Sequence, residues 1–149
     1  MINWIKKLWY GLGDLNDLEW LVLNAVRDQL EPEAVLLWDA QVATFNKVQR
    51  LLGGVETDFY AIDLKTGKPT RDMSKVFPNK QEELLLANVQ LKDSSFQIDI
   101  QVWMVKGFLF CLDFKGSANY WLEYLGGQDD NHFKLEVQCA ILADVMNPA

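Results

Sequence analysis

The carboxylates of Asp99 and Asp113 form the chemically most promising pair in the sequence. Each lies where apolar and polar residues alternate, which is typical of a strand with one buried face. A three-residue turn that pairs Met104 with Phe108 would place Asp99 directly opposite Asp113, on the face turned away from the core. Two facing carboxylates repel each other unless Lys115 relieves them. They can also bind a cation, or share a proton as the acid and base of a hydrolase do.

Two tryptophans accompany this pair. Trp103 is expected on the same sheet face, and Trp121 falls in a predicted helix near 118–125. Three leucines are expected beside Trp103, and the resulting apolar patch is either covered by that helix or exposed as a contact surface. These leucines are Leu84, Leu86 and Leu109. The predicted partner- or ligand-binding residues are therefore Asp99, Asp113, Trp103 and Trp121, with Tyr120 as an additional pocket-lining residue.

The remaining reactive residue types carry no catalytic or metal-binding pattern. The single histidine, His132, follows Asp129 and Asp130, but the spacing fits a polar turn and not a calcium loop. Cys111 and Cys139 lack a motif that would stabilise a thiolate, so we read them as free thiols of a reducing compartment. Phosphate-binding glycine loops and serine-hydrolase elbows are also missing. We predict no catalytic residue, no metal site and no cofactor.

The composition excludes several classes of protein. Half of the 149 residues are apolar, which argues against intrinsic disorder. The 14 basic and 21 acidic residues give a formal net charge of −7. Binding to nucleic acid or to an anionic membrane requires a cationic surface, so neither is expected as the main function.

The charge is unevenly distributed along the chain. Residues 14–39 contain seven acidic residues and one base, Arg27. Residues 64–80 carry five bases against Asp72, with Gly67 and two prolines that predict a loop. We expect this basic loop to be solvated or to dock onto the acidic helices.

The N-terminal part of the chain is predicted to be helical. Residues 2–9 form a short amphipathic segment, in which Lys6 and Lys7 interrupt any signal-peptide core. Apolar residues recur at helical spacing over residues 18–30, after a cap at Asp14 or Asn16. Pro32 ends this helix and suits the first turn of the next one. No apolar run is long enough for a membrane span, and we expect a cytoplasmic protein.

The second half of the chain alternates with the period of strands. Gly53-Gly54 separates two short strands at 48–52 and 55–62, and further strands are expected at 85–91, 96–104, 108–114 and 133–141. Matching their apolar faces favours a three-residue turn at 105–107 and a four-residue loop at 92–95. We therefore predict one α+β domain over 1–149. Its N-terminal helices pack on one face of an antiparallel, meander-like sheet of about 4–6 strands, with a short helix near 118–125.

Three functional hypotheses follow. The first is a non-enzymatic acidic interaction protein of the immunity or inhibitor type. It would bind a basic protein such as a toxin or nuclease through the acidic helices 14–39 or the Asp99/Asp113 face. The second is a small-ligand-binding or hydrolytic domain with an aromatic and carboxylate-lined pocket on the sheet. The third is a homodimer formed through residues 1–10.

Overall fold

Two consecutive helices precede the sheet in the computed structural model, which describes residues 15–126 and 135–148. Helix α2 spans Asp17–Arg27 and starts at a capping box: Asn16 Oδ1 accepts from the Glu19 amide at 2.8 Å, and the Asn16 amide donates to Glu19 Oε1 at 2.9 Å. Helix α3 spans Pro32–Val42, with the proline in its first turn. Of the two predicted caps, Asp14 and Asn16, the helix uses Asn16, and the predicted restart at Pro32 is confirmed.

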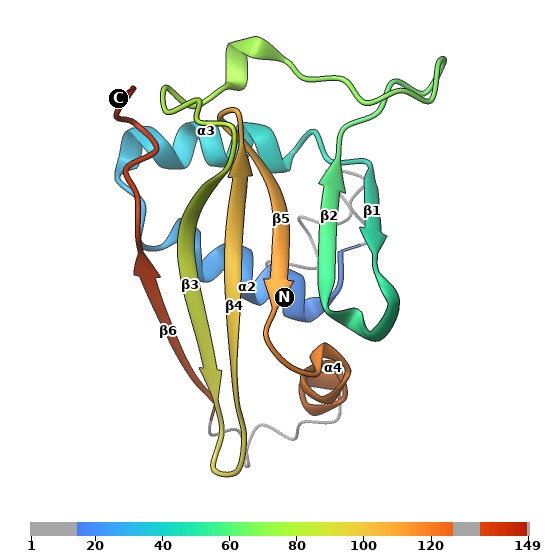
Figure 1. Cartoon of the computed structure of the whole chain (residues 1–149), viewed down its shortest axis with the longest axis vertical. Coiled ribbons are helices and arrows are strands. Elements are labelled where there is room, and N and C mark those ends of the chain that lie inside the picture. The colour runs from blue at the N-terminus through green and yellow to red at the C-terminus, as the bar shows by residue number, and fades with distance from the viewer. Residues whose placement is uncertain (1–14, 127–134, 149) are drawn as a thin grey trace.

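The strands form one antiparallel sheet in the order β1-β2-β5-β4-β3-β6 (Figure 1). β3, β4 and β5 form the predicted meander, and the β1–β2 hairpin turns at Gly53-Gly54 as expected. The described strands are β1 (Lys47–Arg50), β2 (Glu56–Tyr60), β3 (Leu84–Lys92), β4 (Gln97–Val105), β5 (Phe108–Phe114) and β6 (Glu136–Ile141).

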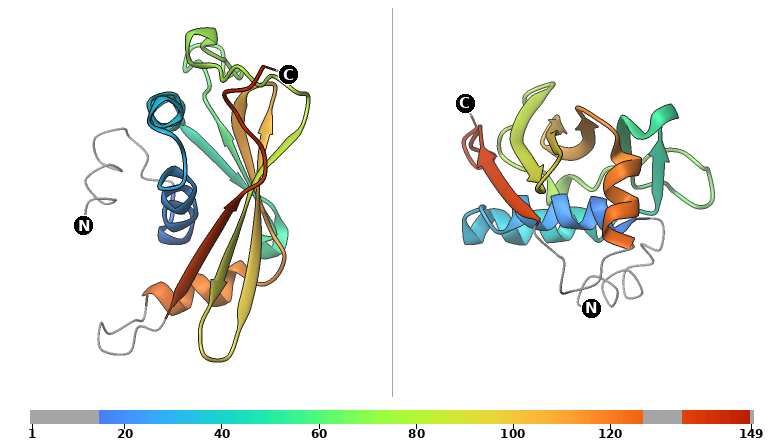
Figure 2. Two further views of the ribbon diagram at one scale, coloured as in Figure 1. Left: turned by 90° about the vertical axis from the view of Figure 1, so that its left-hand side faces the viewer. Right: turned by 90° about the horizontal axis from the view of Figure 1, so that it is seen from below.

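The helices α2 and α3 cover one face of this sheet (Figure 2). Their buried side chains, such as Val22 and Trp38, join strand residues such as Ile100 and Leu112 in one apolar core. The opposite face, which we call the outer face, carries no helix among the residues that the structure describes. The predicted α+β architecture, with helices on one face of an antiparallel sheet, is confirmed.

Helix α4 (Ala118–Gly126) confirms the predicted helix near 118–125, but it does not cover the outer face. It packs beside α2 at one end of the core, where Trp121 is buried (Figure 1). The expected apolar patch is also absent, because Leu84 and Leu109 both pair with Met104 on the core side. Leu86 is fully buried in the same core. The predicted patch of Leu84, Leu86 and Leu109 beside Trp103, whether covered by the 118–125 helix or exposed, was therefore wrong.

The turn between β4 and β5 has two residues, Lys106 and Gly107, and not the predicted three. Both have positive φ (52° and 86°), as in the type I′ turn whose twist matches antiparallel strands. A Cβ on Gly107 would lie 2.6 Å from Val76 Cγ2 and 2.8 Å from the Phe77 carbonyl oxygen, so only glycine fits. A bulge inserts Phe110 into β5, between the pairs Met104↔Leu109 and Trp103↔Cys111.

This bulge changes the predicted register. Ile100 pairs with Phe114 and Val102 with Leu112, two positions from the expected partners. The β3–β4 register is shifted likewise, since Leu91 pairs with Ile98 and not with Phe96. Here the Asp93 carboxylate accepts hydrogen bonds from the Ser95 and Phe96 amides at 2.7 and 2.6 Å, which closes the turn beyond Lys92.

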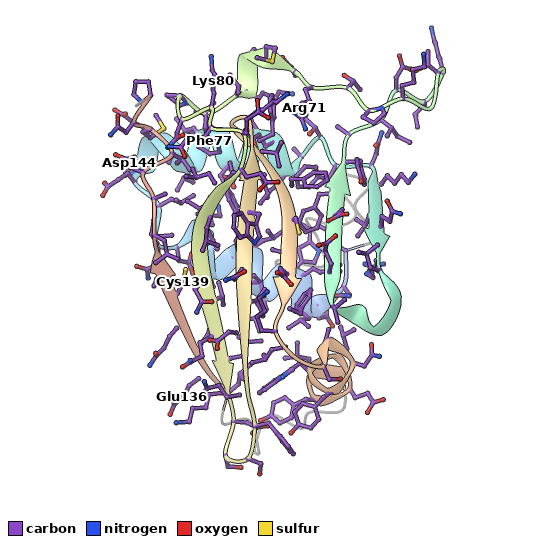
Figure 3. The ribbon with its side chains drawn as sticks, viewed as in Figure 1. Arg71, Phe77, Lys80, Glu136, Cys139 and Asp144 are labelled. Carbon is purple, nitrogen blue, oxygen red and sulfur yellow. The ribbon has the colours of Figure 1, made fainter. Side chains whose placement is uncertain are left out.

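The basic segment 64–80 is a loop with one short 3₁₀ turn, Met73–Lys75, as predicted in outline. It crosses the end of the sheet near the last turn of α3, where Arg71, Phe77 and Lys80 are labelled (Figure 3). The predicted strand 133–141 is confirmed over Glu136–Ile141, which pairs with β3 at the sheet edge. The predicted helix 2–9 and the turn containing His132 lie outside the described residues.

Candidate functional site

The candidate site lies on the outer face, where β2 and β5 pair. In this register Glu56 is the cross-strand partner of Asp113, and Asp58 is the partner of Cys111. Thr57 and Leu112, between these pairs, are both buried on the helix side. Because side chains alternate along a strand, the three carboxylates project together on the outer face. We call Glu56, Asp58 and Asp113 the acidic cluster.

A hollow of about 230 Å³ lies over the acidic cluster. Trp103 on β4 is opposite Cys111, so its indole lies beside the carboxylates on the same face. Phe110, the bulged residue, lines the hollow as well, and Glu83 adds a fourth carboxylate. The site therefore combines negative charge with two aromatic rings.

The charges of the acidic cluster are only partly compensated. The Lys115 ammonium contacts Asp113 Oδ2 at 2.7 Å. Asp58 is 8% exposed, and its Oδ1 has no hydrogen-bond partner among the described residues. Burial, followed by the charges of Asp58 and Asp113, raises the pKa of Glu56 above its usual value. A buried acceptor without a partner is unfavourable for folding, which makes this cluster a candidate for binding a cation.

Cys111 lies beside the acidic cluster, opposite Asp58, but its thiol is expected to be unreactive. Burial and the neighbouring charges of Glu56 and Asp58 raise the pKa of its thiol far above the usual range. Nucleophilic chemistry requires a thiolate, so the raised pKa argues against Cys111 as a nucleophile. Burial also raises the pKa of Cys139 to about 11.

The same residues offer ligands for a metal ion. One ligand atom each from Glu56, Asp58 and Cys111 lies within 4.8 Å of the others. Two carboxylate oxygens and a sulfur form a donor set that a divalent ion such as Zn²⁺ accepts, provided that the thiol loses its proton. The cluster can therefore take either a metal cation or a cationic side chain.

The structure brings two of the four predicted site residues together. Asp113 and Trp103 both line the hollow. Asp99 lies on the outer face but is not opposite Asp113, whose partner on β4 is Gln101. Instead Asp99 Oδ1 accepts hydrogen bonds from the amides of Asn88 at 3.3 Å and Gln90 at 3.2 Å. The predicted facing pair Asp99/Asp113 was wrong because the β4–β5 register differs.

Trp121, the fourth predicted residue, lies in the core and away from the hollow. It is 2% exposed and packs against Tyr120 and Tyr124 with ring centroids 5.2 and 5.7 Å away. Tyr120 itself donates to the Asp93 carboxylate at 2.8 Å. Both side chains therefore hold α4 against the sheet and do not line the hollow.

Glu56 and Asp58 are site residues that were not predicted from the sequence. The segment VETDFY alternates strictly, with Thr57 and Phe59 inward and the two acids outward. This alternation was visible in the predicted strand 55–62. The pairing of β2 with β5, which joins these acids to Asp113, is a long-range contact that the local pattern does not encode.

The acidic helices, the other predicted contact surface, use part of their charge internally. Glu19 is buried and binds the Arg50 guanidinium through two hydrogen bonds of 2.7 and 2.9 Å. Asp39 likewise binds Arg27 at 2.7 and 2.8 Å. These carboxylates hold the helices to the sheet and to each other, so less of the helix charge remains for a partner.

Comparison with protein-family models, with curated proteins and with solved structures gives no match. Among the described residues, no helix combines the length and the apolar character that crossing a membrane requires. Function is therefore argued from the site itself.

Proposed function

We propose that this chain is a non-enzymatic interaction protein whose outer face binds a basic partner protein. The observation that carries the proposal is the like charge that Glu56, Asp58 and Asp113 bring together on one face, where Asp58 Oδ1 has no hydrogen-bond partner among the described residues. A lysine or arginine side chain that enters the hollow would supply the missing counter-charge and donate to the half-buried carboxylates of Glu56 and Asp113.

The aromatic residues of the hollow suit the same partner. Trp103 and Phe110 lie beside the carboxylates, and aromatic rings attract ammonium and guanidinium groups over their faces. Tryptophan is also among the residues that contribute most to binding energy at protein interfaces. A cationic side chain with an apolar stem would therefore contact rings and carboxylates at once.

The charge of the whole chain supports a basic partner. A net charge of −7 attracts a cationic protein over long range and accelerates the encounter at low ionic strength. A basic toxin or nuclease, neutralised as an immunity or inhibitor protein would do, has the required surface. Both cysteines are free thiols, in keeping with the reducing cytoplasm.

Affinity capture with matched variants tests this function. Wild-type protein, Glu56→Gln/Asp58→Asn and Glu31→Gln/Glu33→Gln are each incubated with a native lysate at low and moderate salt. Each double variant removes two negative charges, but Glu31 and Glu33 are exposed at the start of α3. We expect a basic protein that the wild type and Glu31→Gln/Glu33→Gln (the helix variant) retain at low salt and lose at moderate salt. Glu56→Gln/Asp58→Asn (the cluster variant) should not retain it. Recovery of the bait alone, or loss only with the helix variant, would contradict the proposal.

The metal-binding capacity of Glu56, Asp58 and Cys111 adds a second arm to this experiment. Capture is repeated after treatment with a chelator and after addition of Zn²⁺. If a lysine or arginine side chain of the partner fills the hollow, treatment with a chelator leaves capture unchanged and added Zn²⁺ competes with the partner. Capture that requires a metal ion would show instead that the cluster is a metal site.

A further inference from the structure

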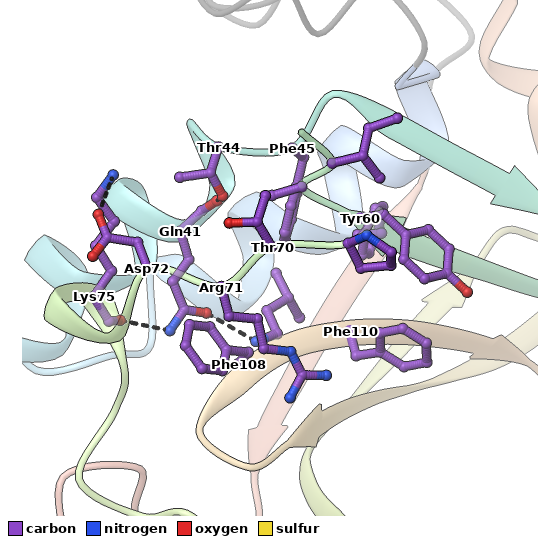
Figure 4. Close-up of a pocket in the computed structure, with 15 residues that line it drawn as sticks. Gln41, Thr44, Phe45, Tyr60, Thr70, Arg71, Asp72, Lys75, Phe108 and Phe110 are labelled. Atoms are coloured by element: carbon purple, nitrogen blue, oxygen red, sulfur yellow. Dashed lines mark hydrogen bonds and ion pairs between the residues drawn. The ribbon is translucent and has the colours of Figure 1, made fainter. Parts of the chain in front are cut away.

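A second and larger cavity, of about 520 Å³, lies at the end of the sheet below the basic loop. Its walls come from the last turn of α3, the end of β2, the start of β5 and the loop residues Thr70, Arg71 and Lys75 (Figure 4). Pockets for small molecules have this size and commonly combine apolar walls with a few polar groups. Phe110 lines both this cavity and the acidic hollow, so the two sites are neighbours.

Gln41 links the walls of the cavity to each other. Its side chain is buried, donates to the carbonyl oxygens of Lys75 at 2.7 Å and Gly107 at 2.9 Å, and accepts from the Leu109 amide at 2.8 Å. These bonds tie the basic loop and the β4–β5 turn to α3. A wall fixed in this way is preorganised, and a ligand loses less entropy on binding to it.

The lining is suited to a flat ring. Phe45 stacks on Phe59 with centroids 5.1 Å apart, and Tyr60 meets Phe110 edge-to-face at 5.5 Å. Phe108 provides a further ring beside them. Aromatic surfaces in these geometries favour another aromatic ring over an aliphatic chain.

The charge of the cavity is positive, although the protein is acidic overall. The Arg71 guanidinium lies over the Phe108 ring at 5.3 Å, and no carboxylate forms an ion pair with it in the part of the chain that the structure describes. The one acid in the lining, Asp72, accepts from the Ser74 amide and hydroxyl and contacts Lys75 at 3.4 Å. Asp72 is therefore occupied within its own turn, and Arg71 remains available to an anion.

We propose that this cavity binds a small aromatic carboxylate. The ring would pack against the half-buried rings of Tyr60, Phe108 and Phe110, and the carboxylate would accept two hydrogen bonds from the Arg71 guanidinium. This inference is independent of the proposed protein partner, because it uses a different cavity and the opposite charge. It also gives the basic loop a function, whereas the binding of a basic partner at the acidic cluster does not involve this loop.

An NMR titration of the full chain with 2-naphthoate tests the proposal. We expect a dissociation constant of about 1 mM or below, with the largest amide shifts around Arg71, Phe108 and Tyr60. The uncharged 2-naphthamide tests the need for the carboxylate, and acetate tests the need for the ring. Both should bind at least about tenfold more weakly.

Two variants locate the charge. Arg71→Gln should weaken naphthoate binding by about tenfold, while Lys68→Gln, which removes the same charge from the same loop outside the lining, should leave it unchanged. Both positions are exposed, so neither substitution disturbs the core. Equal binding of naphthoate and naphthamide, no effect of Arg71→Gln, or shifts elsewhere on the protein would overturn the proposal.

Discussion

Glu56 on β2 and Asp113 on β5 are direct cross-strand partners, so two carboxylates face each other on the outer face of the sheet. Facing like charges reduce the stability of an antiparallel pair. Lys115 compensates Asp113, but Asp58, two residues along β2, adds a third carboxylate to the same surface. This arrangement fits a binding surface, because a cationic partner would relieve the repulsion between these carboxylates that persists in the free protein.

Removing this repulsion should stabilise the free protein. The raised pKa of Glu56 means that the folded state holds its proton more tightly than the unfolded chain. The contribution of Glu56 to stability should therefore fall as the pH rises from the usual glutamate pKa through the raised one. We expect Glu56→Gln to increase the free energy of unfolding at pH 7 by about 0.5 kcal/mol, and by nothing near pH 3. Urea unfolding at both pH values measures this. A destabilised variant at pH 7 would show that Glu56 has a favourable partner.

The two arginine–carboxylate pairs of the helices should differ in their contribution to stability. Arg50→Met leaves the buried Glu19 carboxylate without its cation and should cost about 3 kcal/mol. Arg27→Met breaks a pair whose side chains are 33% and 41% exposed, and should cost less than about 1 kcal/mol. Chemical denaturation of both variants gives the comparison. Equal losses would contradict the structural role assigned to Glu19.

The tryptophans predicted as site residues should have different roles. Trp121→Ala empties a core position and should lower the free energy of unfolding by about 3–5 kcal/mol. Trp103→Ala acts on the outer face, so its main effect should be on partner binding and its cost to stability smaller. Thermal unfolding and capture of both variants separate these effects. A fully stable Trp121→Ala protein would contradict the packing of α4.

Both thiols should resist alkylation in the folded protein. Their raised pKa values leave almost no thiolate at pH 8, and Cys111 is also buried. We expect iodoacetamide to modify Cys111 and Cys139 quickly in urea and slowly in native buffer. Mass spectrometry of the two peptides over time measures the rates. Rapid native modification of Cys111 would indicate an activated thiolate and reopen an enzymatic role.

Local signals in the sequence predicted most of the fold. Asn16 caps α2 with Glu19, and Pro32 starts α3, because both effects depend on neighbouring residues alone. The alternation within β4 correctly placed Ile98, Ile100, Val102 and Met104 in the core. These features follow from the geometry of a single element.

Features that depend on two elements could not be predicted in this way. A two-residue turn at Lys106-Gly107 without a bulge would pair Ile100 with Asp113. Such a pair would put a core residue and an outer-face residue on the same side of the sheet. The inserted Phe110 restores the match, and a bulge of this kind is determined by packing across strands. The acidic cluster depends on the pairing of β2 with β5, which are more than fifty residues apart in the chain.

Titration of the captured basic protein against three forms of this chain measures whether the acidic cluster is the binding surface. Isothermal calorimetry at two salt concentrations compares the wild type with Glu56→Gln/Asp58→Asn and with Glu31→Gln/Glu33→Gln. We predict at least about tenfold weaker binding for the cluster variant and less than about threefold for the helix variant, with affinity falling as salt rises. Unchanged affinity of the cluster variant, together with a loss for the helix variant, would place the interface on the helices and not on the acidic cluster.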